Sequence, residues 1–274
     1  MNPDRLRQRA AITAAIRSWF SDNGYLEIHT PCVVESPALE EHLEAIPVGH
    51  RFLHTSPEFA MKRVLSSGLC RIYQIGPCFR DDERGIHHAQ EFTMVEWYRA
   101  NAGTADLMDD AEHLVAAAAR AVAKPSPSFE RRSVQSIREA VGLPETDDEI
   151  EWFRGWVEKA EPHLTRPTIV YDYPAWQAAL AQERNGCADR FEMYLQGIEI
   201  GNCFAEESDA KILRDRFELS AKKRIQMGKA PHPIDESLLK ATPRMPRTAG
   251  MAIGLDRLVM ALTGVNDIQA VQVR

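Results

Sequence analysis

The chain has 274 residues, 44% of them hydrophobic, and a formal net charge of −7 from 33 basic and 40 acidic side chains. This length allows one large domain or two small ones. No apolar run approaches the roughly 20 residues that span a bilayer, and the acidic balance does not favour a mainly electrostatic grip on nucleic acid. The five scattered cysteines form no CxxC pair, and the N-terminus lacks the apolar core of a signal peptide, so we expect a cytoplasmic protein without disulfides.

Hydrophobic periodicity predicts helices and strands in an irregular order. In chain order, these are a helix over Leu6–Asn23, a strand over 25–30, a short helix over 56–68, strands over Arg71–Phe79 and Glu91–Arg99, a helix over Asp106–Lys124, strands over 168–173 and Arg190–Ile200, a helix over Asp209–Met227, a strand over Gly250–Ile253 and a helix over Asp256–Leu262. Strands that arrive in pairs favour an α+β fold with a mixed or antiparallel sheet flanked by helices. We expect one domain over 1–274, with a helical insertion over 125–167.

No G-x-G-x-x-G and no G-x-x-x-x-G-K-[ST] is present, so neither a Rossmann nor a P-loop nucleotide site is indicated. Three other segments carry the chemistry: GYLEIHTP, FR followed by HHAQEF, and GMAIGLDRLVM near the C-terminus. Their order and spacing resemble motifs 1, 2 and 3 of class II aminoacyl-tRNA synthetases. The resemblance is closest to the lysyl-tRNA synthetase core, through TSPEFAMKR, EFTMVEWY, DRFEMYLQGIEIGNCFAEESDA and GLDRLVM, and it covers nearly the whole chain.

The resemblance implies an ATP site around the two motif arginines. Arg80 would bridge the α-phosphate and the amino-acid carboxylate, and Arg257 would lie against the adenine and the γ-phosphate. Phe92 would stack on the adenine, and His88 would lie near the phosphates. Asp82 stands where the family has a glutamate that contacts the adenine amino group. Taken singly, each arginine would more often pair with a nearby acid.

Glu192 and Glu199 match the pair of acids that hold Mg²⁺ on the ATP phosphates in this family, a role suited to carboxylates. A spacing of seven places them on opposite faces of a straight strand. Gly197 lies between them and supplies a turn, so we expect the two glutamates to face each other across a hairpin.

The remaining acids predict the substrate. The resemblance implies that Glu58 takes the amino group near the reacting end and Asn202 contacts the carboxylate, while Glu206, Tyr98 and Glu96 receive a distal ammonium. Burying an ammonium without a partner is costly, so a lysine pocket must carry its own carboxylates. Gly201 matches the glycine of lysyl-tRNA synthetases, whereas the related protein-lysylating family often has alanine there, and glycine would leave room for α-lysine. The choice between α-lysine, β-lysine and another diamino acid stays open.

The predicted first helix begins by Leu6, so we expect no anticodon-binding domain of the kind that a lysyl-tRNA synthetase carries. A core without that domain resembles the elongation factor P–lysine lysyltransferase family. The resemblance implies a homodimer, with the helix and strand of motif 1 around Pro31 at the interface. It also implies an enzyme that uses ATP and Mg²⁺ to form an aminoacyl-adenylate and passes the amino acid to a lysine of elongation factor P. We do not expect tRNA as a partner. Two alternatives remain: another acceptor, such as a carrier protein, a small amine or a tRNA, and a non-catalytic paralogue that senses an amino acid.

Overall fold

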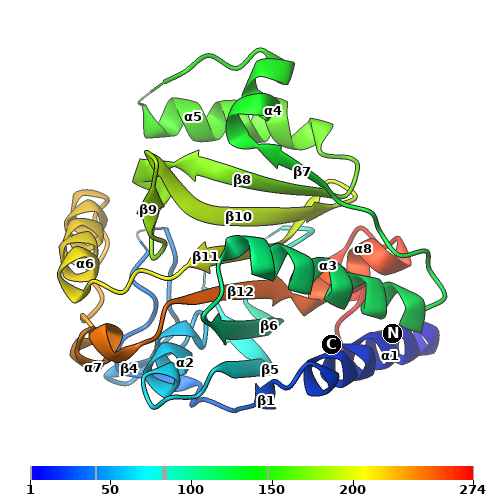
Figure 1. The fold of residues 1–274 in the computed structure, drawn as a ribbon, viewed down its shortest axis with the longest axis horizontal. Coiled ribbons are helices and arrows are strands. Elements are labelled where there is room, and N and C mark those ends of the chain that lie inside the picture. The colour runs from blue at the N-terminus through cyan, green and yellow to red at the C-terminus, as the bar shows by residue number, and fades with distance from the viewer. Residues whose placement is uncertain (1, 41, 82–84, 147, 274) are drawn as a thin grey trace.

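The computed structural model describes residues 2–40, 42–81, 85–146 and 148–273. Within these ranges nine strands form one mixed sheet (Figure 1). Across the sheet the strands are β1 (Leu26–Glu27), β5 (Arg71–Phe79), β6 (Glu91–Ala100), β12 (Thr248–Gly254), β11 (Ile198–Ala205), β10 (Cys187–Leu195), β8 (Thr168–Pro174) and β7 (Glu130–Ser133), with β9 (Glu183–Arg184) beside β10. The outer pairs β1–β5 and β7–β8 are parallel and the pairs between them are antiparallel, which confirms the predicted α+β class. A small second sheet has the order β2 (Val33–Val34), β4 (Arg51–Leu53) and β3 (Pro47–Val48).

Several of the helices begin at a side chain that caps their N-terminus. The helices are α1 (Pro3–Asp22), α2 (Glu58–Leu65), α3 (Thr104–Ala121), α4 (Val134–Val141), α5 (Glu149–Gly155), α6 (Ala210–Gln226), α7 (Glu236–Ala241) and α8 (Leu255–Thr263). Short 3-10 or π-helical turns cover Trp156–Ala160, Glu161–His163, Ala175–Gln177, Thr242–Arg244 and Ile268–Ala270. Asp209, for example, accepts the free N–H groups at the start of α6. No helix among the described residues is long and apolar enough to cross a membrane.

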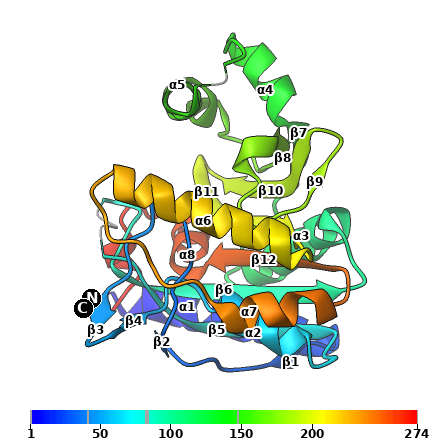
Figure 2. The same cartoon turned by 90° about the vertical axis from the view of Figure 1, so that its left-hand side faces the viewer.

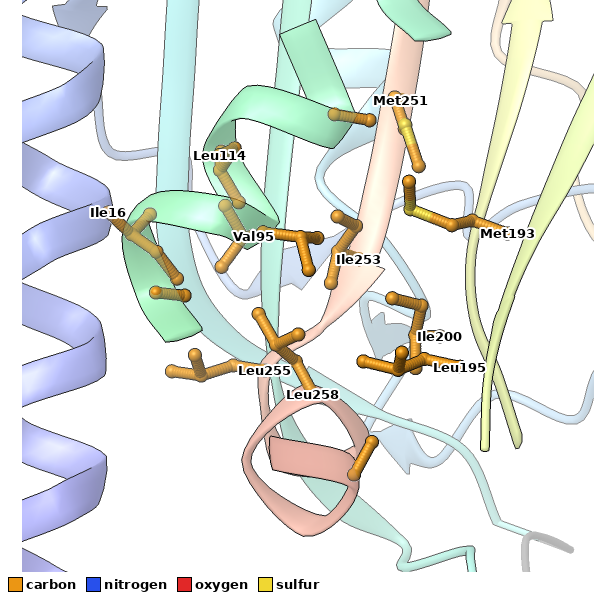
Figure 3. Close-up of a cluster of buried hydrophobic side chains, with 14 of the residues drawn as sticks. Ile16, Val95, Leu114, Met193, Leu195, Ile200, Met251, Ile253, Leu255 and Leu258 are labelled. Carbon is orange, nitrogen blue, oxygen red and sulfur yellow. The ribbon is translucent and has the colours of Figure 1, made fainter. Parts of the chain in front are cut away.

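The main core lies between the sheet and the helices α1, α3 and α8. Figure 3 shows Ile16 of α1 and Leu114 of α3 converging on Val95 of β6 and Ile253 of β12. These four side chains are fully buried. Strand β6 alternates, so that Val95 and Trp97 belong to this core, while Glu96 and Tyr98 project from the opposite face of the sheet.

A second group of helices lies on the other side of the molecule. Figure 2 shows α6 running above α7 and α2. Their apolar faces meet through Phe59 of α2, Leu213 and Phe217 of α6, and Leu238 of α7. Of these helices, α2 packs on the face of the sheet that carries Glu96 and Tyr98, because its Met61 and Leu65 share a cluster with Tyr98.

Residues 125–167 contain α4 and α5 as expected helices, and both lie beyond β7 and β8 at one end of the sheet (Figures 1 and 2). They also contain β7, which was not predicted. Its sequence, ERRS, has no apolar alternation, and it is a strand because it pairs in parallel with β8. The stacked rings of Trp152 and Trp156, 5.1 Å apart, form the core of this end. The assignment of residues 125–167 as an insertion within one domain remains a prediction.

Candidate active site

The face of the sheet opposite the main core carries a cavity of about 310 Å³. Its walls come from β6, β11, β12, α2 and α8 and from the segment between β5 and β6. All but two of the predicted site residues line it. The exceptions are Glu192, which lies outside the lining, and Asp82, which falls outside the described residues.

One end of the cavity is a buried acidic pocket. Glu96 accepts hydrogen bonds from Ser56 Oγ and from Tyr98 OH, each 2.7 Å long. Only 2% of its surface is exposed. Burial, and next the charge of Glu58, raises the pKa of Glu96 to about 7. The predicted acids Glu58 and Glu96 therefore lie close enough for their charges to interact.

Lys62 pairs with two acids of this pocket, and it was not predicted as a site residue from the sequence. Its Nζ lies 2.6 Å from Glu58 Oε1 and pairs with Glu206 Oε2. Burial lowers the pKa of Lys62, but Glu206 and Glu58 outweigh it and leave the pKa above its ordinary value. Burial raises the pKa of Glu206 to about 8, even with Lys62 beside it. The spacing of Glu58 and Lys62, four residues on a predicted helix, was the available signal.

A β-bulge places the next part of the wall. Ile200 lies between the paired residues Gly201 and Glu199 and has no partner on β10. As a result Glu199 and Asn202 lie opposite Tyr194 and Glu192. The Oδ1 atom of Asn202 is buried and has no hydrogen-bond partner in the described part of the chain. A buried amide oxygen without a partner fits a wall that meets a polar ligand.

The backbone of Gly201 lines the cavity, but a Cβ added at this position would not point into it. A Cβ at this position would lie 2.6 Å from the carbonyl oxygen of Ala252 and 2.8 Å from Ile253 Cγ1, on the side of the main core. The expectation that glycine leaves room inside the pocket is therefore corrected: alanine would press on β12. Gly250 is the glycine that gives room in the pocket, because a Cβ there would lie 2.3 Å from Tyr98 Cε1 and 2.6 Å from Glu206 Oε1.

The other end of the cavity is basic and aromatic. The guanidinium of Arg80 lies over the ring of Phe92, 5.1 Å from its centre. Arg257 Nη2 lies 2.7 Å from His88 Nε2, and Arg257 also donates to the carbonyl oxygens of His87 and Glu199. The two motif arginines therefore lie in one cavity, as expected for an anion site beside the acidic pocket.

Glu192 and Glu199 share one face of the β10–β11 hairpin, whose turn is at Gln196 and Gly197, both with positive φ. Burial, and next the charge of Glu192, raises the pKa of Glu199 to about 7. Glu192 is already engaged: Tyr173 and Tyr194 donate to its Oε2, and Arg190 pairs with its Oε1.

Glu161 was not predicted. It lies in the 3-10 turn after α5, and burial and the charge of Glu192 raise its pKa. No three His, Cys, Asp or Glu side chains within the described ranges are arranged to hold a metal ion. Two carboxylates on one face do fit Mg²⁺, which usually takes one or two carboxylates together with substrate phosphates.

Comparison with known proteins identifies the family of this chain. The family model described as "tRNA synthetases class II (D, K and N)" matches residues 2–273. The chain is 35% identical to the elongation factor P–(R)-β-lysine ligase of Proteus mirabilis (strain HI4320), over 97% of this chain and 93% of the relative. It is 34% identical to the protein of the same name from Salmonella typhi, over 96% of this chain and 92% of the relative. The chain therefore belongs to the class II tRNA synthetases, a family of ATP-dependent aminoacyl ligases, in the branch that holds these two relatives.

Proposed function

We propose that this enzyme activates lysine or a lysine-like diamino acid with ATP and transfers it to a lysine side chain of elongation factor P. One observation carries the proposal: three buried carboxylates lie in the same cavity as the two motif arginines. The carboxylates suit a substrate with two ammonium groups, and the arginines suit the phosphates and the carboxylate that react.

The proposed reaction has two steps. A carboxylate oxygen of the amino acid attacks the α-phosphorus of ATP, and pyrophosphate leaves with the electrons of the broken P–O bond. The acceptor amine then attacks the carbonyl carbon of the mixed anhydride, AMP leaves, and the new amide nitrogen loses a proton. No nucleophile of the enzyme is needed, because orientation and charge stabilisation supply the catalysis.

The named residues would divide this work. Glu58, Glu96, Tyr98 and Glu206 would fix the ammonium groups, and Asn202 would contact the carboxylate. Arg80 would hold that carboxylate against the α-phosphate, and Arg257 would neutralise the distal phosphates. Glu192 and Glu199 would hold Mg²⁺, whose charge would offset that of the triphosphate.

The acceptor rests on the names of the relatives, which specify elongation factor P and (R)-β-lysine. Coverage of nearly the full length of both chains supports carrying the acceptor over. The amino acid is proposed more broadly as a diamino acid, because the pocket acids suit any molecule with a second ammonium at the right reach.

The test is amino-acid-dependent exchange of pyrophosphate into ATP with lysine, β-lysine, ornithine and arginine. Exchange is expected with at least one diamino acid, and Arg80→Ala should lower it by about 100-fold or more. Circular dichroism serves as the control for folding. Background exchange with all four amino acids would overturn the adenylation proposal.

The acceptor is tested separately by mass spectrometry of elongation factor P incubated with the enzyme, ATP, Mg²⁺ and the amino acid that supports exchange. A mass increase of one aminoacyl group on a lysine is expected. Exchange without any such increase would keep the activation step and reject the acceptor, in favour of a carrier protein, a small amine or a tRNA.

A further inference from the structure

The acidic pocket contains a cation that belongs to the protein itself. Lys62 follows Glu58 by one turn on α2 and pairs with both Glu58 and Glu206. Its side chain is only 2% exposed, and it is not among the residues that line the cavity, whereas the three pocket acids are. The ammonium group therefore contacts the carboxylates on the side away from the cavity. The side that faces the cavity stays open to a ligand.

The titratable groups near Lys62 come from three elements. Glu58 comes from α2, Glu96 and Tyr98 from β6, and Glu206 from the end of β11. Tyr98 is neutral, since burial and the neighbouring acids hold its pKa well above the ordinary value. Three carboxylates against one ammonium leave two negative charges when all the acids are ionised.

Resting on the function proposed above, we infer that Lys62 is a positioning residue that holds Glu58 and Glu206 together and sets the pocket charge to match two ammonium groups. A diamino acid neutralises the pocket. A monoamino acid leaves one buried carboxylate without a partner, and that is unfavourable. Without Lys62, Glu58 and Glu206 would repel each other, and the pKa of Glu206 would rise further because Lys62 lowers it. Lys62 therefore contributes to specificity without touching the substrate.

The test compares Lys62→Met with Lys62→Arg in lysine-dependent exchange over a range of pH. Lys62→Met should raise KM for lysine by about tenfold or more and leave KM for ATP within about twofold, because only the amino-acid end loses a charge. The acidic limb of kcat/KM for lysine should move up by about one pH unit, since an adjacent opposite charge lowers a carboxyl pKa by about 1–3 units. Lys62→Arg, which keeps a cation, should recover much of the lost affinity.

A folded Lys62→Met protein whose KM for lysine and acidic limb both match wild type would overturn the inference. Absence of exchange in wild type at every pH would instead overturn the proposed function. In that case the titration of ¹³C-labelled glutamate carboxyls still decides the role of Lys62, because Lys62→Met should raise the pKa of Glu206 and an unchanged Glu206 titration would refute the inference.

A measurement on wild type covers the case in which Lys62→Met does not fold. Calorimetry with lysine and with norleucine, which lacks the distal ammonium, should show norleucine binding about 100-fold more weakly or not at all. Equal affinity for both compounds would show that the pocket is not matched to two ammonium groups and would reject the inference.

Discussion

Glu206 combines deep burial, a cationic neighbour and a cavity-facing position in one side chain. It is 3% exposed, it pairs with Lys62, and burial still raises its pKa from the ordinary 4.5 to about 8. A pKa in this range favours the protonated carboxyl near neutral pH, and we expect the ammonium of a ligand to displace this proton. We therefore predict that Glu206 links amino-acid binding to pH.

Glu206→Gln should flatten the pH dependence of stability. The folded pKa lies above the unfolded one, so between pH 4.5 and about 8 the folded state binds more protons than the unfolded state. The contribution of Glu206 to the free energy of unfolding is therefore complete below this window and falls as pH rises through it, by on the order of a few kcal/mol. Urea unfolding at several pH values measures the slope. The exposed Glu218→Gln is the control, and an unchanged slope in Glu206→Gln would contradict the assignment.

At the scale of elements, local patterns predicted most of the sheet. Strand β5 has the predicted bounds, Arg71–Phe79, and β6 extends the predicted Glu91–Arg99 by one residue. Both have apolar residues on a buried face, which the sequence displays directly. Strand β7 could not be found in this way, because its pairing with β8 and not its own composition makes it a strand.

The site was predicted less completely than the sheet, for a geometric reason. The extra residue Ile200 changes which residues of β11 share a face, and no residue type in the sequence marks it. Because of this bulge, a side chain at position 201 would point toward the core. Lys62 was missed because its contact with Glu206 exists only after α2 packs beside the end of β11. The roles of the site residues remain predictions.

Gly250 tests how closely β12 must approach the pocket. A methyl group there would overlap the ring of Tyr98 and the carboxylate of Glu206. Gly250→Ala should therefore raise KM for lysine by about tenfold or more and lower the free energy of unfolding by about 1–3 kcal/mol. Gly254→Ala, on the same strand, is the matched control, because its nearest neighbour atoms lie 3.8 Å away. Equal KM values for the two variants in the exchange assay would show that the pocket tolerates the displacement.

At the scale of the whole molecule, the cavity depends on segments from most of the chain. The fold brings Glu58, Glu96, Asn202 and Arg257 together from two helices and two strands. The part of the fold before α2 contributes little to the cavity lining and leaves apolar side chains exposed: Leu26 on β1 is 51% exposed and Val33 on β2 is 39% exposed. These residues flank Pro31, where the family resemblance implies a dimer interface.

Leu26→Glu combined with Val33→Glu should convert a dimer into a monomer. Two carboxylates placed in an apolar contact would lose hydration without gaining partners, which would cost several kcal/mol of association free energy by an order-of-magnitude estimate. Sedimentation velocity of wild type should give the mass of a dimer, and the double variant should give that of a monomer. Leu219→Glu is the control: it is also exposed, but it lies on α6, away from β1 in both views (Figures 1 and 2). A wild-type monomer would rule out the dimer, and a double variant that remains dimeric would place the interface elsewhere.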